Sequence, residues 1–108
     1  MIKATFYKTI DDRYKGFSVS GHAGYAKAGK DIICASVSAL VINTVNSIEN
    51  LTSNKTEVEC DEGGMIKFKF ADESDEKGQL LVDALCFGLT EISNEHGHNY
   101  LKVYFKEV

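Results

Sequence analysis

The sequence contains no proline, which excludes cis-proline turns and helices that end at a proline ring. It also lacks an excess of basic residues, since 12 Lys and Arg stand against 16 Asp and Glu and the formal net charge is -4. This balance argues against a wide basic face for nucleic acid, although it leaves room for a small local basic patch. We therefore expect no direct nucleic-acid partner.

Cysteines are few and far apart. Cys34, Cys60 and Cys86 are odd in number and form no CxxC pair, which argues against both a disulfide framework and a zinc knuckle. Residues 1–16 alternate between apolar and polar side chains and do not resemble a signal peptide. We expect reduced thiols in a cytoplasmic protein, with no cofactor, no metal, no membrane partner and no stretch long enough to span a membrane.

The chain is long enough for one real hydrophobic core. Of its 108 residues, 44% are hydrophobic and 26% are charged, which is ordinary for a globular protein and argues against disorder. No linker or low-complexity segment divides it. We expect a single domain covering residues 1–108.

Hydrophobic periodicity predicts five strands and two helices in the order ββαββαβ. Apolar side chains alternate with polar ones in the strands, whereas in the helices they recur at helical spacing and cover more than one stripe. The expected fold is α+β, with an antiparallel sheet packed against two buried helices. The strands are expected at residues 1–9, 16–21, 57–60, 65–71 and 100–106, and the helices at 31–51 and 79–95.

Residues 21–38 carry the chemistry. His22 follows the second strand and Cys34 lies in the first turn of the first helix, so both flank the same loop. A helix N-terminus and a nearby imidazole both favour the thiolate, which is the nucleophilic form of cysteine. The imidazole can then protonate a leaving amine, and backbone N–H groups around Cys34 could contribute to an oxyanion hole. Cys34 as nucleophile and His22 as acid and base are therefore the candidate pair of a cysteine peptidase, although a helical cysteine is more often a small buried hydrophobe and a histidine at a strand end is usually an ordinary polar residue.

Several neighbouring residues are candidates for supporting roles. Asp31 suits the helix N-cap and could also orient His22. Ser38 lies one turn after Cys34 and could hydrogen-bond to the sulfur, the histidine or the substrate, or could simply pack in the helix. Gly21 is a candidate strand terminator. In the loop itself, Gly24 and Gly29 are either ordinary loop residues or hinges of a flap that closes over substrate. Tyr25 could help to close the pocket, although a solvent-facing loop tyrosine is more usual.

The same residues resemble those of the ribosomal-processing cysteine protease family, often called Prp. Gly21-His22 precedes a glycine-containing loop, and Asp31-Ile-Ile-Cys-Ala35 begins a helix with Ser38 one turn on. The resemblance implies a bacterial enzyme that removes a short N-terminal extension from large-subunit ribosomal protein L twenty-seven. It also implies that Cys34 and His22 are the catalytic pair, that the loop is mobile until substrate binds, and that the enzyme is a homodimer.

Three other interpretations remain open at this point. Residues 24–30 fit the GxxxxGK pattern of a phosphate-binding loop, but Asp31 follows where Ser or Thr should hold magnesium. A non-enzymatic ribosome-associated protein that binds a ribosomal protein tail would carry an ordinary thiol at Cys34. His96 and His98 could suggest a metal, although two histidines without a third ligand are more typical of a solvated turn.

Overall fold

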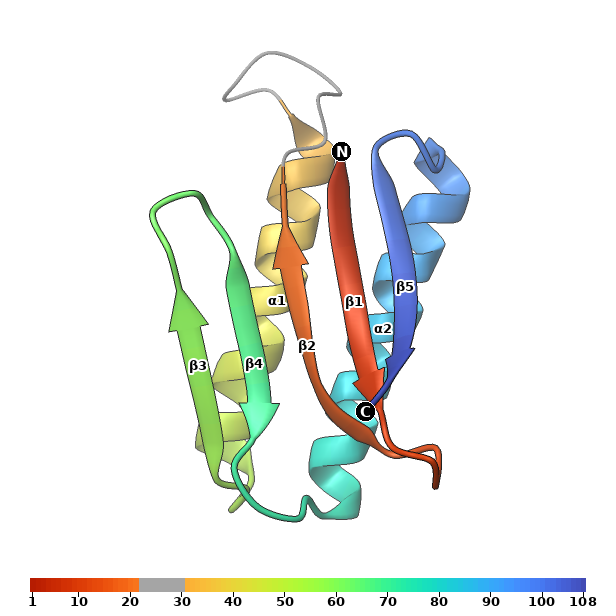
Figure 1. Cartoon of the computed structure of the whole chain (residues 1–108). Helices are drawn as coiled ribbons and strands as arrows, with labels where there is room; N and C mark the ends of the chain where they lie inside the picture. Colours follow the sequence, from red (N-terminus) through yellow and green to blue (C-terminus); the bar gives the residue numbers. More distant parts are fainter. Residues whose placement is uncertain (22–30) are drawn as a thin grey trace.

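The protein is a two-layer α+β domain in the computed structural model, which describes residues 1–21 and 31–108 (Figure 1). The predicted element order ββαββαβ is confirmed. The described elements are β1 (Ile2–Lys8), β2 (Tyr14–Ser20), α1 (Ile32–Leu51), β3 (Thr56–Cys60), β4 (Ile66–Phe70), α2 (Glu76–His96) and β5 (Leu101–Glu107).

The strands form one sheet in the order β3-β4-β2-β1-β5. Two hairpins pair in antiparallel fashion, as expected, but β5 runs parallel to β1, so the sheet is mixed rather than wholly antiparallel. The cause is the crossover through α2, which carries the chain from β4 over β2 and β1 to the far edge without reversing the strand direction. Strand periodicity specifies which face a residue occupies, but it does not specify the direction of a neighbour.

Both helices cover the same face of the sheet, and the core lies between the two layers (Figure 1). Alternate residues of the strands point toward the helices because successive strand side chains face opposite sides. Stacked and edge-to-face rings link neighbouring strands, with Phe17 and Phe68 at 4.9 Å between centroids. The largest fully buried side chains in this core are Phe6, Phe17, Phe68, Ile33, Ile48, Leu89 and Leu101.

The helix α1 corrects one expectation from the sequence. An 18-residue stretch of this 20-residue helix has a mean hydropathy of 1.5, so α1 is long and apolar enough to cross a membrane by length and composition alone. In the structure, however, one side of α1 packs on the sheet through Ile33, Val37, Val41 and Ile48. A core helix satisfies the same criterion of length and hydropathy, so the criterion does not identify a membrane span here.

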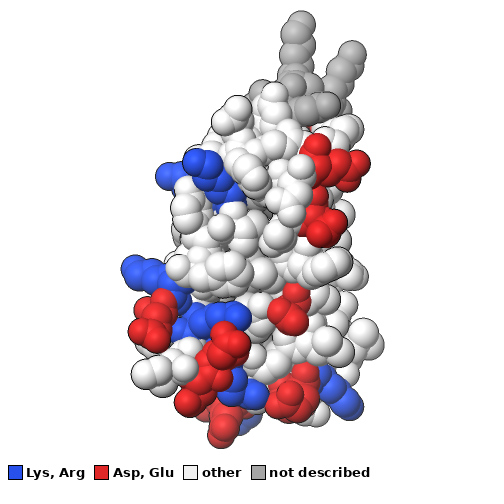
Figure 2. Space-filling view, turned by 90° about the vertical axis from the view of Figure 1, so that its right-hand side faces the viewer, with Lys and Arg blue, Asp and Glu red and all other residues white. Residues whose placement is uncertain are grey.

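The other face of the sheet is not covered by any described element (Figure 1). It carries the polar members of the alternating strands. In Figure 2, where the sheet is seen from the side of β5, Lys and Arg side chains of the upper half lie toward this open face and carboxylates lie toward the helices. In this half of the view the two sides of the domain therefore differ in charge, whereas in the lower half carboxylates and cations are mixed.

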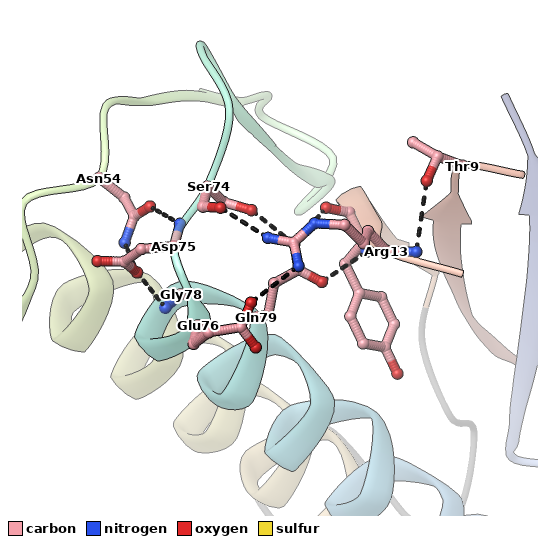
Figure 3. A network of polar contacts seen from close by, with 9 residues as sticks. Thr9, Arg13, Asn54, Ser74, Asp75, Glu76, Gly78 and Gln79 are labelled. Carbon is pink, nitrogen blue, oxygen red and sulfur yellow. Dashed lines mark hydrogen bonds and ion pairs between the residues drawn. The ribbon is translucent and has the colours of Figure 1, made fainter. Parts of the chain in front are cut away.

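A polar network fastens the turn between β1 and β2 to the start of α2 (Figure 3). Arg13 donates to the Ser74 carbonyl at 2.7 Å, and Gln79 exchanges two hydrogen bonds of 2.8 Å with the backbone of Tyr14. Asp75 caps the helix by accepting from the Gly78 N–H at 2.9 Å. For this reason α2 begins at Glu76, three residues earlier than its apolar pattern predicted.

Candidate active site

Cys34 occupies the first turn of α1, as predicted, and its side chain is half-buried at the margin of the core. The helix begins at Ile32, and Asp31 precedes it in extended conformation. A thiol in this position lies near the positive end of the helix dipole and is not sealed in the interior. It therefore has the helix N-terminus that the sequence predicted for a nucleophile, whereas the nearby imidazole of His22 lies outside the described residues and stays a prediction.

Asp31 is the N-cap of α1. One carboxylate oxygen accepts the backbone N–H groups of Ile33 and Cys34 at 3.1 and 3.0 Å. The Ala35 N–H donates to the Asp31 carbonyl at 3.1 Å. The N–H groups around Cys34, which the sequence suggested as oxyanion donors, are therefore engaged by Asp31 in this conformation. The sequence predicted the cap, but it did not show that the cap occupies the N–H groups that an oxyanion would need. This depends on which carboxylate oxygen faces the helix.

Gly21 ends β2 in a backbone conformation that favours glycine. Its φ is +91°, and a Cβ atom there would collide with the carbonyl oxygen of Met1. The end of β2 and the start of α1 lie at the same end of the molecule (Figure 1). Gly21 thus directs the chain out of the sheet beside the first residue of β1, at the point where the predicted catalytic loop begins.

Ser38 is exposed on α1, one helical turn after Cys34. Its neighbour Ser36 bonds back to the Ile32 carbonyl at 2.6 Å and is committed to the helix backbone. Ser38 is thus on the same side of the helix as Cys34 and accessible from solvent. This placement is compatible with the supporting role that we predicted, which stays a prediction.

The remaining predicted site residues lie outside the described part of the chain. They are the proposed acid and base His22 and the loop residues Gly24, Tyr25 and Gly29. Their roles rest on the sequence.

The other two cysteines have different surroundings from Cys34. Cys60 is exposed at the end of the edge strand β3. Cys86 is buried in α2, and this burial raises the pKa of its thiol above the ordinary value. Cys34 is therefore the one cysteine that combines a helix N-terminus with partial exposure.

A buried tyrosine near Cys86 was not singled out by the sequence. Tyr14 donates a 2.6 Å hydrogen bond to the Asp83 carboxylate. Burial raises the pKa of Tyr14, and the bond to Asp83 raises it further. No sequence signal links the two residues, because 69 positions separate them and only the packing of β2 on α2 brings them together.

The His-Gly-His segment spans the end of α2, where His96 is the last helical residue, Gly97 is the C-cap and His98 lies in the turn that follows. The Ser93 hydroxyl donates to the Leu101 carbonyl at 2.7 Å and lies 2.7 Å from Nδ1 of His98. Since that hydroxyl proton is used, Nδ1 of His98 acts as the donor. Within residues 1–21 and 31–108, no three His, Cys, Asp or Glu side chains gather as metal ligands. His98 serves to fasten the connection between α2 and β5.

Solved structures share this arrangement over nearly the whole chain. A Staphylococcus aureus ribosomal processing protease Prp, crystallised with a covalently linked product peptide, superposes with a TM-score of 0.93 at 26% identity, covering 98% of this chain and 100% of that one. A Streptococcus mutans protein superposes with a TM-score of 0.86 at 31% identity, covering 100% and 96%. The fold and the matches to relatives define a cysteine protease.

Sequence comparison gives the family. The sequence profile of the cysteine protease Prp family matches residues 1–101. The ribosomal processing cysteine protease Prp of Bacillus subtilis is 32% identical over 104 residues, which cover 92% of this chain and 93% of that protein. The chain belongs to the Prp family.

Proposed function

We propose that this cysteine protease removes the N-terminal extension of a ribosomal protein precursor, namely large-subunit protein L twenty-seven. The names of its relatives support the processing role, since the Bacillus subtilis and Staphylococcus aureus proteins are ribosomal processing proteases. Crystal structures of the Staphylococcus aureus protease with a substrate peptide and with a covalently linked product peptide support a peptide partner. L twenty-seven follows from the family resemblance of residues 21–38.

In the proposed reaction, the Cys34 thiolate attacks the scissile carbonyl carbon and forms a tetrahedral oxyanion. The C–N bond then breaks as His22 donates a proton to the leaving amine, which leaves an acyl-enzyme thioester. His22 next takes a proton from water, the hydroxide attacks the thioester, and the Cys34 thiolate leaves with the acid product released. No external oxidant, reductant or metal is needed for this cycle.

The observation that carries this proposal is the position of Cys34. It is half-buried in the first turn of a capped helix, whereas Cys60 sits on an edge strand and Cys86 is sealed in the core. Partial positive charge from the helix N-terminus favours the thiolate there.

The supporting residues act around this pair. Asp31 caps the helix at 3.0 Å from the Cys34 nitrogen, and rotation of its carboxylate toward His22 would release that N–H for the oxyanion. Ser38 offers a hydroxyl on the same side of α1. Gly21, Gly24 and Gly29 let the loop close over the extended substrate, with Tyr25 contributing an aromatic side chain.

The decisive experiment mixes the protein with the host's own precursor of L twenty-seven and follows the extension by mass spectrometry. The wild type should trim the precursor. Cys34→Ala should bind the precursor without cutting it, and His22→Ala should lose most of the rate. Cys60→Ala is the matched control, because it removes an exposed thiol away from α1 and should leave the rate unchanged.

Normal trimming by Cys34→Ala would refute the catalytic assignment. Binding without trimming by the wild type would instead favour the non-enzymatic alternative, in which the protein only holds a ribosomal protein tail. Trimming of other precursors but not of L twenty-seven would keep the chemistry and change the substrate.

We further propose that the enzyme is a homodimer formed through its helix layer. Residues 32–48 of α1 carry no charged side chain, and Ile32 and Ile42 are 54% and 50% exposed. On α2, Leu80 and Phe87 are also exposed. Sedimentation equilibrium should give twice the chain mass of 11.9 kDa, and Ile42→Glu should shift it toward the monomer.

We place the enzyme in the cytoplasm, where the thiol that this chemistry needs stays reduced. Cys34, Cys60 and Cys86 are all thiols in the structure. Fractionation of the native host, with detection by an antibody, should recover the protein with the soluble fraction or the ribosomes; recovery outside the cell would contradict this placement.

A further inference from the structure

The open face of the sheet gathers positive charge from strands that are far apart in the sequence. Cross-strand register places Lys3 on β1 opposite Lys102 on β5, and Tyr7 opposite Lys106. On the other side, Ser18 and Gly16 of β2 lie opposite Lys67 and Lys69 of β4. Lys15 stands at the β-bulge between β1 and β2 and lines the same face. Six lysines therefore share one surface of a chain whose net charge is -4.

Most of these lysines have no carboxylate partner in the part of the chain that the structure describes. Within residues 1–21 and 31–108, Lys69 alone among the six forms an ion pair, with Glu57 at 3.0 Å. Glu59 lies opposite Lys67 at the β3 edge and offsets part of the charge there. Like charges directly opposite each other, such as Lys3 and Lys102, destabilise a sheet. This arrangement costs stability, and a bound anion would recover it.

The lysines border a trough with a floor of short side chains. Thr5, Ser18 and Gly16 occupy the middle strands, where long side chains would fill the space. The trough has a volume of about 440 Å³ at the end lined by Tyr7, Lys15, Gly16, Lys67, Lys69 and Lys106. Long cationic side chains on β4 and β5 thus flank a shallow channel, whose lining also includes Thr9, Phe68 and Val108.

Two tyrosines lie on the same face as the lysines. Tyr104 on β5 is 41% exposed and lies opposite Thr5, and Tyr7 on β1 donates to or accepts from the Ser18 hydroxyl at 3.1 Å. Aromatic rings among lysines on an open sheet provide stacking surfaces for bases and charges for phosphates. We propose that this face binds single-stranded RNA, with the lysines on the phosphates and Tyr104 under a base.

Charge complementarity selects RNA over the other occupants of such a face. A second copy would place lysines against lysines. A ribosomal protein tail rich in Lys and Arg would be repelled in the same way. RNA supplies the phosphates that the unpaired lysines lack. The helices lie behind the sheet with Cys34 on α1, so an RNA strand on the open face leaves the candidate active site accessible (Figure 1).

The test measures fluorescence anisotropy of a labelled single-stranded RNA of about 12 nucleotides with the full chain. The wild type should bind in about 50 mM salt and weaken steeply toward about 200 mM. Lys67→Gln and Lys102→Gln, one from each side of the trough, should each weaken binding about fivefold at about 0.1 M salt and lower the slope against log salt by about 0.7. Lys77→Gln on α2 is the matched control, and it should change affinity less than about twofold.

Further readouts separate RNA from other anions and from substrate binding. Tyr104→Ala should weaken binding of the single strand more than binding of the same RNA as a duplex, since only unpaired bases stack on a ring. The lysine variants should trim a ribosomal protein precursor at the wild-type rate. The proposal is overturned if the wild type does not bind RNA in low salt, if Lys77→Gln weakens binding as much as Lys102→Gln, if polyglutamate binds in place of RNA, or if the lysine variants lose trimming while RNA binding is unchanged.

Discussion

The carboxylate of Asp31 binds the backbone of the proposed nucleophile, since it accepts the N–H of Cys34 at 3.0 Å. As a cap it stabilises the helix that presents the thiol. It also occupies an N–H that could otherwise bind an oxyanion. The cap that holds the helix therefore competes with the oxyanion for the same N–H.

Substitution of Asp31 should separate its charge from its role as the helix cap. Asp31→Asn keeps a capping oxygen and removes the charge, so we expect faster alkylation of Cys34 by iodoacetamide and a change in unfolding free energy below about 0.5 kcal/mol. Asp31→Ala removes the cap and should cost about 1 kcal/mol. Urea unfolding and alkylation rates check both variants. Slower alkylation in Asp31→Asn would indicate that Asp31 instead orients His22 toward the sulfur.

The three thiols should differ in reactivity. Cys34 should be alkylated at least about tenfold faster than Cys60 at neutral pH, because the helix N-terminus favours its thiolate. Cys86 should be the slowest, since burial both blocks access and raises the pKa of its thiol. Peptide mapping by mass spectrometry after short exposure to iodoacetamide measures all three together. Equal rates at Cys34 and Cys60 would remove the argument for an activated nucleophile.

Gly21 and Gly64 form a matched pair for testing the backbone at the loop. Both have positive φ, +91° and +89°, but only at Gly21 would a Cβ meet another part of the chain, the carbonyl oxygen of Met1. Gly64→Ala should cost about 1–2 kcal/mol for the left-handed conformation alone. Gly21→Ala should cost more and should also reduce trimming. Equal losses in urea unfolding would show that the Met1 contact relaxes without cost.

The Tyr14 hydroxyl predicts how stability changes at alkaline pH. The pKa of this hydroxyl is raised above 10.0 in the folded protein, so its contribution to the free energy of unfolding is fully present below pH 10.0. Above it, the unfolded chain loses the proton first, and stability falls as pH rises. Tyr14→Phe should lose about 1–2 kcal/mol at neutral pH, since it removes the bond to Asp83, and should show a flatter decline above pH 10. If the unfolding free energies of the wild type and Tyr14→Phe fell equally steeply above pH 10, this would contradict a raised pKa at Tyr14.

Local patterns predicted most of the elements, because alternation and helical spacing are properties of adjacent residues. Ile66, Phe68 and Phe70 alternate with lysines and form β4, close to the predicted bounds. The parallel pairing of β5 was missed, since strand direction depends on the path of α2 over the sheet. The start of α2 was missed because Asp75 and a network from Arg13 and Gln79 fix it, and none of these carries an apolar period.

The candidate site, like the fold, could be predicted only in part from the sequence. The cap at Asp31 and the place of Cys34 follow from short spacing along the chain, and the structure confirms both placements. The geometry of His22 relative to the sulfur stays a prediction. The lysines of the open face could not be foreseen from a net charge of -4, because register across β1, β2, β4 and β5 assembles them.

The pairing of β1 with β5 joins strands that are far apart in the sequence. Ile2 lies opposite Leu101 and Lys8 opposite Glu107, so of the five strands the first to be synthesised pairs with the last. During synthesis, one edge of β1 keeps its hydrogen-bonding groups unpaired until β5 has emerged from the ribosome. A translation product that stops before β5 would therefore lack the complete sheet that supports the protease.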